Sequence, residues 1–210
     1  MNSRTPFALV ATLGLAGLLS GCSSSHGVKN PSGVGVTQMR ADEQGFVAGT
    51  GVESQDLVFV TDKMARSILN TPQIANAQGV PRVALDPVEN ATRFPINKEV
   101  FLDRMRAQLN SQAHGKVIFL ARERMAALQR ERQMKQNGQV TTASDPNAVE
   151  FKGADFLLTG KLSGLSTRNS AGASDYILYT FQLIDTRTSE IIWEDSAEIK
   201  KQGLEDAAYR

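Results

Sequence analysis

Apolar residues recur along this chain at two spacings, which separate the expected helices from the expected strands. After Ser54, the residues Leu57, Val60, Met64 and Ile68 follow one another at intervals of three and four. That spacing is typical of one buried face of a helix, and the polar residues just before Leu57 can cap its start. We therefore expect the first helix to begin near Ser54.

Two further segments have helical features. Asn97 is a candidate cap for a second helix, and Gly115 is a candidate stop signal for it. The apolar face of this helix consists of Phe101, Leu102, Met105 and Leu109. An arginine-rich third helix is expected over residues 121–136.

Short apolar runs and segments rich in β-forming residues predict the strands. The first two are expected over residues 82–89, ending near Pro87, and over the KVIFL segment at 116–120. Three more are expected at the end of the chain, over 154–167, 176–185 and 190–199. The connections between these last three are short enough for hairpins.

This order of elements predicts an α/β fold. We expect a mixed β-sheet of about five strands with helices packed on it, in two or three layers, ending in a three-strand antiparallel meander. The first two strands enclose a helix, as in a βαβ unit, so we expect them to be parallel.

The first residues have the three-part order of a secretory signal. Arg4 and the amino terminus are positive, Phe7 to Leu19 is an apolar run of 13 residues, and small residues follow. A membrane-spanning helix needs about 20 apolar residues, so this run is too short to be one. A short buried helix is the alternative, but no polar cap precedes it and a serine-rich stretch follows it.

The chain has a single cysteine, Cys22, in the sequence Leu19-Ser20-Gly21-Cys22. This stretch resembles the lipobox of bacterial lipoproteins, in which the cysteine is acylated and becomes the first residue of the mature chain. Cys22 is therefore the predicted lipid attachment site. In enteric-type lipoproteins an aspartate at the next position retains the protein at the inner membrane, so Ser23 favours the outer membrane. A free thiol or an intermolecular disulfide would leave the position of Cys22 unexplained.

We therefore expect three parts: a signal peptide at 1–21, a lipidated flexible tether at 22–45 and a periplasmic α/β domain at 46–210. Glycine, proline and serine make up nine of the 24 residues of the tether, which has few large apolar side chains. Removal of residues 1–21 takes away one of the 23 basic residues and none of the 22 acidic ones, which leaves a net charge of zero. This balance gives no electrostatic basis for binding nucleic acid.

The sequence contains no recognisable catalytic, metal or cofactor motif. His26 falls in the expected tether, and His114 precedes Gly115 at a helix end, where a cation is favourable. The adjacent acids Glu194 and Asp195 would point to opposite faces of a strand. We expect no enzyme activity, no cofactor, no metal and no small-molecule substrate.

Two surface features each fit either a structural or a partner-binding interpretation. Basic residues outnumber acidic ones over 122–135, which fits a solvated helix with pairs such as Glu131–Lys135 or a face for an acidic partner. The aromatic residues of the meander fit a buried core, although an exposed one could anchor a partner. These aromatic residues are Phe156, Tyr176, Tyr179, Phe181 and Trp193.

Segment 176–195, YILYTFQLIDTRTSEIIWED, resembles the Y-x-L-x-F-x-L-x-D-x-x-T-G-E-I-x-W signature of LpoB-type lipoproteins. The resemblance extends upstream to further segments that occur in the order of that family, at 49–57, 64–69, 81–84 and 153–160. It therefore covers about residues 49–201. One departure is Ser189, where the family usually has glycine in the turn, and this asks for a slightly different turn geometry.

The resemblance implies an outer-membrane lipoprotein facing the periplasm that binds and activates a bifunctional class A penicillin-binding protein. It would thereby regulate peptidoglycan synthesis, and through it cell-wall biogenesis and cell shape. The signature residues are framework, so the resemblance assigns no partner-contact residues. A structural component of an envelope assembly or secretion complex is the alternative from a different class. It is less favoured because a pore-former needs a long hairpin of alternating polar and apolar residues. The longest pair here, 154–167 with 175–186, is a single hairpin whose faces are both largely apolar, which suits a sheet covered by helices.

Overall fold

The computed structural model describes residues 36–45, 47–140 and 151–204. The chain divides into two units, Met1–Gln38 and Met39–Arg210, and all the elements below belong to the second. The predicted signal peptide, Cys22 and most of the predicted tether lie outside the described residues.

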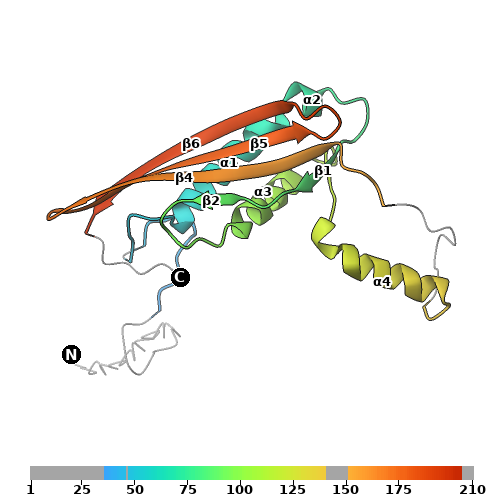
Figure 1. Ribbon diagram of the computed structural model, residues 1–210, viewed down its shortest axis with the longest axis horizontal. Coiled ribbons are helices and arrows are strands. Elements are labelled where there is room, and N and C mark those ends of the chain that lie inside the picture. The colour runs from blue at the N-terminus through green and yellow to red at the C-terminus, as the bar shows by residue number, and fades with distance from the viewer. Residues whose placement is uncertain (1–35, 46, 141–150, 205–210) are drawn as a thin grey trace, which may run out of the picture. The chain divides into compact units, whose positions relative to one another are not determined.

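The fold is a mixed α/β arrangement built on a six-stranded sheet (Figure 1). Its strand order is β3-β1-β4-β5-β6, and β2 pairs with β4. The strands are β1 (Arg82–Leu85), β2 (Glu89–Ala91), β3 (Ile118–Phe119), β4 (Phe156–Asn169), β5 (Gly172–Asp185) and β6 (Ile191–Gly203). The helices are α1 (Ser54–Leu69), α2 (Pro72–Ala75), α3 (Glu99–Gln112), the 3₁₀ turn η1 (Arg122–Arg124) and α4 (Met125–Gln136).

The predicted βαβ unit is confirmed. Strands β1 and β3 pair in parallel, and β1 also pairs in parallel with β4. The expected strand at 82–89 is in fact two strands, because it is interrupted between Leu85 and Glu89. Pro87 lies in this gap and has no backbone N–H to donate to a ladder. After it, β2 rejoins the same edge of β4, opposite Lys161 to Ser163.

The three-strand meander is also confirmed: β4 has the expected length but lies two residues further along the chain, and β5 and β6 are longer than expected. The β4–β5 ladder continues to the pair Asn169–Gly172, so the hairpin turn lies between these two residues rather than over 168–174. Ser189, in the β5–β6 turn, has φ 63°. It therefore adopts a left-handed conformation that glycine reaches without steric cost.

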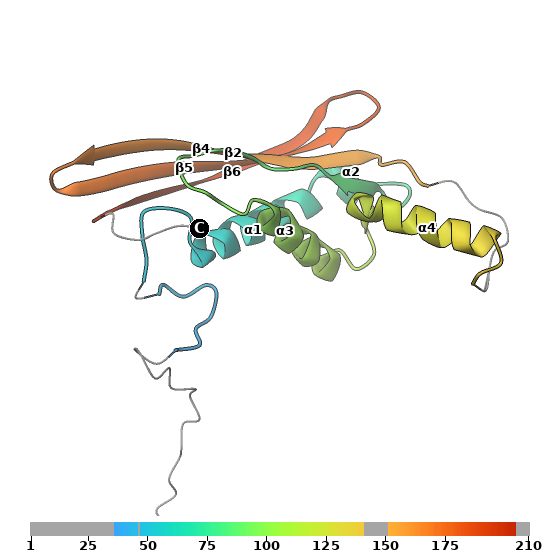
Figure 2. The same ribbon diagram turned by 60° about the horizontal axis from the view of Figure 1, so that its bottom comes forward.

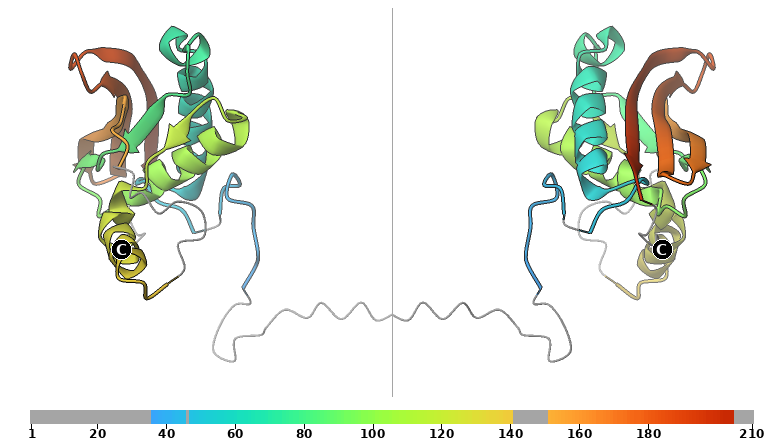
Figure 3. Two further views of the ribbon diagram at one scale, coloured as in Figure 1. Left: turned by 90° about the vertical axis from the view of Figure 1, so that its right-hand side faces the viewer. Right: turned by 90° about the vertical axis from the view of Figure 1, so that its left-hand side faces the viewer.

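Helices α1 and α3 lie on the same face of the sheet, as Figures 2 and 3 show. Every residue of the two predicted apolar faces is buried except Leu57, which is half-buried. Phe101 of α3 packs against the rings of Tyr179 and Phe181, with centroid distances of 5.8 and 6.4 Å. Gly160 is required beside Phe181, because a Cβ there would lie 2.5 Å from the phenylalanine ring.

Two helix boundaries differ from the prediction. Helix α3 is preceded by Lys98 rather than capped by Asn97, and no side chain caps its N-terminus. The helix expected from residue 121 begins with the 3₁₀ turn η1 and becomes α-helical at Met125. Gly115 follows α3 with φ 81°, in agreement with its expected role as a stop signal.

Candidate partner-binding surfaces

A row of polar contacts fastens α1 to β6, the last strand of the sheet. Lys63 donates to the Asp195 carboxylate at 3.1 Å and also to the backbone carbonyl of Ser196. On either side of Lys63, Asp56 pairs with Lys201, and the Trp193 Nε1–H donates to Ser67 Oγ at 2.9 Å. These contacts join two framework elements, so they hold the fold together.

A buried ion pair fastens the segment after β2 to the far end of the β4–β5 hairpin. Arg93 forms two bonds of 2.8 and 2.7 Å to the Asp175 carboxylate, which is only 1% exposed and also accepts from Ser166 Oγ. The Arg93 bond, against the opposing effect of burial, holds the pKa of Asp175 well below its ordinary value. The carboxylate is thus ionised at neutral pH and bonded to Arg93 and Ser166, which suits a structural role.

The adjacent acids of β6 point apart, as expected. Glu194 is exposed and accepts from Gln182 on the neighbouring strand. Asp195 lies on the side of α1 and accepts from Lys63. They cannot act together as an acid and a base on one bond.

The described residues offer no metal site, since they contain no group of three or more His, Cys, Asp or Glu that could hold an ion. His114 is exposed and has φ 46° immediately after α3. No described helix is long and apolar enough to cross a membrane. Cys22 and His26 lie outside the described residues.

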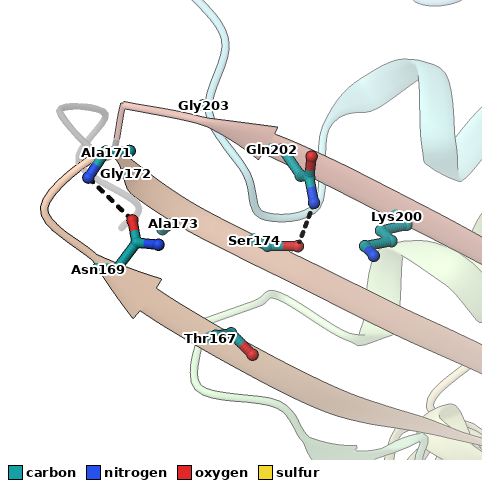
Figure 4. A pocket seen from close by; sticks show the side chains of 9 residues that line it. All are labelled: Thr167, Asn169, Ala171, Gly172, Ala173, Ser174, Lys200, Gln202 and Gly203. Carbon is teal, nitrogen blue, oxygen red and sulfur yellow. Dashed lines mark hydrogen bonds between the residues drawn. The ribbon is translucent and has the colours of Figure 1, made fainter.

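A hollow of about 400 Å³ lies at the β4–β5 hairpin tip. Figure 4 shows the residues that line it. Some of its polar groups already bond to each other: Gln202 donates to Ser174, and the Ala171 N–H donates to the Asn169 side chain. Its lining contains hydroxyl, amide and ammonium groups but no carboxylate, imidazole or thiol. It therefore lacks the groups of an acid–base or nucleophilic site.

Helix α4 is the strongest candidate for a binding surface, because none of its residues is buried. The predicted Glu131–Lys135 pair is present at 3.7 Å. Two contacts tie the helical segment to the start of the β4 region: Arg122 donates to the Lys152 carbonyl at 2.7 Å, and the Arg132 guanidinium lies 3.7 Å from the centroid of the Phe151 ring.

The core interpretation of the meander aromatics is confirmed for four of the five. Phe156, Tyr179, Phe181 and Trp193 are at most 9% exposed. Tyr176 is half-buried on the other face of the sheet, where Leu165 pairs with it in register and is 71% exposed. This face lies opposite α1 and α3, and it also carries Leu157, Leu178 and Ile184.

The hairpin-tip hollow and the Arg93–Asp175 pair were not predicted from the sequence. The expected strands stopped at residues 167 and 199, whereas β4 and β6 continue to Asn169 and Gly203 and form the hollow. For the ion pair, the sequence contains a weak signal: Asp175 stands in the same alternating register as Ile177, Tyr179 and Phe181, which are buried.

The fold and these surfaces define a mixed α/β domain whose buried charges are structural and whose basic helix α4 contains no buried residue. The family model described as the peptidoglycan-synthase activator LpoB matches residues 56–199. The chain belongs to this family, and the predicted resemblance is confirmed.

Solved structures with this general arrangement include members of the family. The LpoB C-terminal domain from Salmonella enterica is 17% identical, covers 69% of this chain and 98% of its own, and has a TM-score of 0.41. The NMR structure of E. coli LpoB is 15% identical, covers 96% of each chain and has a TM-score of 0.41. Lipoprotein GNA1162 from Neisseria meningitidis is 21% identical, covers 58% of this chain and 83% of its own, and has a TM-score of 0.36. No match is found among curated proteins.

Proposed function

We propose that this chain is an outer-membrane lipoprotein that faces the periplasm and activates a bifunctional class A penicillin-binding protein. The observation that carries the proposal is the family match over residues 56–199, which includes every strand and helix of the domain except the first two residues of α1 and the last four of β6. The chain acts by binding: it shifts the synthase toward its active conformation and does no chemistry itself.

Cys22 supplies the anchor in this proposal. After cleavage before Cys22, acyl chains on the thiol and on the new amino terminus hold the protein in the membrane, since two chains give the stable attachment that one does not. The tether at 22–45 then connects the anchor to the domain.

Activation is tested with the full chain purified from its membrane in detergent. Each class A synthase of the same cell is titrated with it, and both binding and the rate of glycan polymerisation are followed. Saturable binding to one synthase with an increased rate is the expected result. Binding to none would remove the proposal and make the envelope-assembly alternative the better one.

The anchor is tested separately by mass spectrometry of the membrane-purified protein. The expected result is a chain that lacks residues 1–21 and carries acyl mass at Cys22. The Cys22→Ser variant should leave the membrane fraction while the purified variant still activates the synthase. An unacylated Cys22 in the wild-type protein would contradict the anchor without affecting the activator proposal.

A further inference from the structure

The hollow at the β4–β5 hairpin tip lies on the open face of the sheet (Figure 4). Helices α1 and α3 both lie on the other face, so they do not cover it. Because side chains alternate between the two faces of a strand, the ladders place five polar side chains of the lining together on the open face. These side chains are Thr167, Asn169, Ser174, Lys200 and Gln202.

Two hydrogen bonds orient the amide side chains of this lining. Gln202 Nε2 donates to Ser174 Oγ at 3.1 Å, and the Ala171 N–H donates to Asn169 Oδ1 at 2.8 Å. The Gln202 Oε1 atom and the Asn169 NH₂ group have no partner among the residues that the structure describes. The two amides are therefore held in place by the fold, and each presents a polar group that is available to a ligand.

The available groups of the hollow are mainly hydrogen-bond donors. The Thr167 hydroxyl and the Lys200 ammonium make no hydrogen bond or ion pair within the described part of the chain. Together with the Asn169 NH₂ group they offer several donors, whereas the available acceptors are the oxygens of Gln202 and Thr167. The lining contains no carboxylate. A matching ligand is therefore neutral or anionic and presents several acceptor oxygens.

A row of two apolar side chains borders the hollow on the same face. Leu165 and Tyr176 pair in register, and they lie two residues along their strands from Thr167 and Ser174. Leu165 is 71% exposed, and Tyr176 is half-buried. A ligand that extends beyond the hollow meets this row, so it needs an apolar face beside its polar groups.

We propose that the hollow and the Leu165–Tyr176 row together bind a glycan strand built from acetamido sugars. The inference rests on the proposed function, since an activator of a peptidoglycan synthase works beside the glycan that this enzyme makes. The C–H groups on the face of a sugar ring pack on Leu165 and on the apolar body of Tyr176. Acetamido and hydroxyl oxygens accept from the donors of the hollow, and a sugar hydroxyl donates to Gln202 Oε1. The volume of about 400 Å³ lies within the usual range of small-ligand sites, roughly 300–1,000 Å³.

The charges of this face favour a saccharide over a phosphate group. Among the described residues that line the hollow, Lys200 alone is cationic. Glu198 lies two residues before it, on the same face of β6, and opposes an anion there. Phosphate sites instead combine arginine side chains with converging backbone N–H groups. The same argument disfavours the head group of an anionic phospholipid.

The test measures co-sedimentation of the full, detergent-purified chain with purified peptidoglycan sacculi. Thr167→Ala/Gln202→Ala removes one hydroxyl and one amide from the hollow. Thr159→Ala/Gln182→Ala is the matched control, because it removes the same two groups from a pair at the other end of the open face. We expect the hollow variant to bind about tenfold more weakly than wild type, since it loses two hydrogen bonds to the glycan, and the control to bind like wild type.

Two further measurements sharpen this test. Leu165→Ala should also weaken sacculus binding, and its high exposure means that the core stays intact. Glycan strands freed of their peptides by an amidase should displace the wild-type chain from sacculi, whereas the released peptides should not.

The other outcomes overturn the inference. Absence of sacculus binding by wild type, equal binding by the two double variants, or displacement by the peptides alone would each show that the hollow does not bind glycan. If wild type binds vesicles of anionic phospholipid and the hollow variant loses that binding but keeps its sacculus binding, the hollow is a lipid site. The sacculus assay contains no synthase, so a failure here leaves the activator proposal to be judged by the synthase titration.

Discussion

Helices α1 and α4 are both well-formed helices in one domain, but the rest of the protein supports them very differently. Six of the 16 residues of α1 are buried, and polar contacts at three of its positions fasten it to β6. None of the 12 residues of α4 is buried, and Arg132 at its inward side lies on a single aromatic ring. The first helix is therefore part of the cooperative core, whereas the second is available to a partner. Three predictions can break or sharpen this comparison.

The largest difference is expected between two methionines. Met64 of α1 is fully buried, whereas Met134 of α4 is not. Met64→Ala leaves a cavity and should lower the free energy of unfolding by about 2–5 kcal/mol. Met134→Ala should change it by less than about 0.5 kcal/mol. Urea unfolding of both variants measures the difference, and equal losses would show that α4 packs as α1 does.

A smaller effect is expected at the fastening between α1 and β6. Burial opposes ionisation of Asp195, but bonds from Lys63 and from the Ser196 N–H give it a net pKa below the ordinary value. Lys63→Met removes the first bond and should cost about 1 kcal/mol at neutral pH, since the pair is partly exposed.

The contribution of Asp195 to the free energy of unfolding should depend on pH. Because the pKa of Asp195 is lowered in the folded state, its contribution is fully present above the unfolded pKa of about 3.9 and is lost as the pH falls through the folded pKa. Wild type should therefore lose more stability than Lys63→Met on acidification from pH about 5. Parallel stability–pH curves would show that Lys63 does not lower that pKa.

The smallest effect on global stability is expected in α4. Ala127→Gly should destabilise the helix locally by about 1 kcal/mol and increase amide hydrogen exchange there, while the midpoint of global unfolding stays unchanged. Ala65→Gly in α1 is the matched change at a fully buried position, and it should lower that midpoint. If Ala127→Gly lowers the midpoint equally, α4 unfolds together with the core.

The contrast between the buried helix α1 and the exposed helix α4 also explains which elements the sequence could predict. The helical spacing of apolar residues located α1 and α3, because burial on one face imposes that spacing. The meander was located by its three segments rich in β-forming residues and the short connections between them. The Arg-rich segment was predicted as a helix, but its composition could not say whether its charges were paired within the fold.

Features that depend on pairing between distant parts of the chain could not be predicted from the pattern of apolar residues. Strand β2 has only three residues, and only its parallel pairing with Lys161 to Ser163 defines it. The four-residue helix α2 is too short to show a period. At the hairpin tip, polar residues such as Arg168 and Asn169 resemble a turn, yet the ladder continues through them because β5 and β4 remain in register.

The contacts of Lys63 have one more consequence, for the solubility of the protein. Strand β6 ends the sheet, and an open edge of 13 residues is a template on which another chain can add a strand. At the middle of β6, the Ser196 carbonyl accepts from Lys63 and the Ser196 N–H donates to the Asp195 side chain. The N–H and the C=O of Ser196 are therefore already bonded. A strand from another molecule that approached this edge would find the Lys63–Asp195 ion pair there and no free donor or acceptor at Ser196. The pair that fastens α1 to the sheet thus also protects the protein against edge-to-edge aggregation.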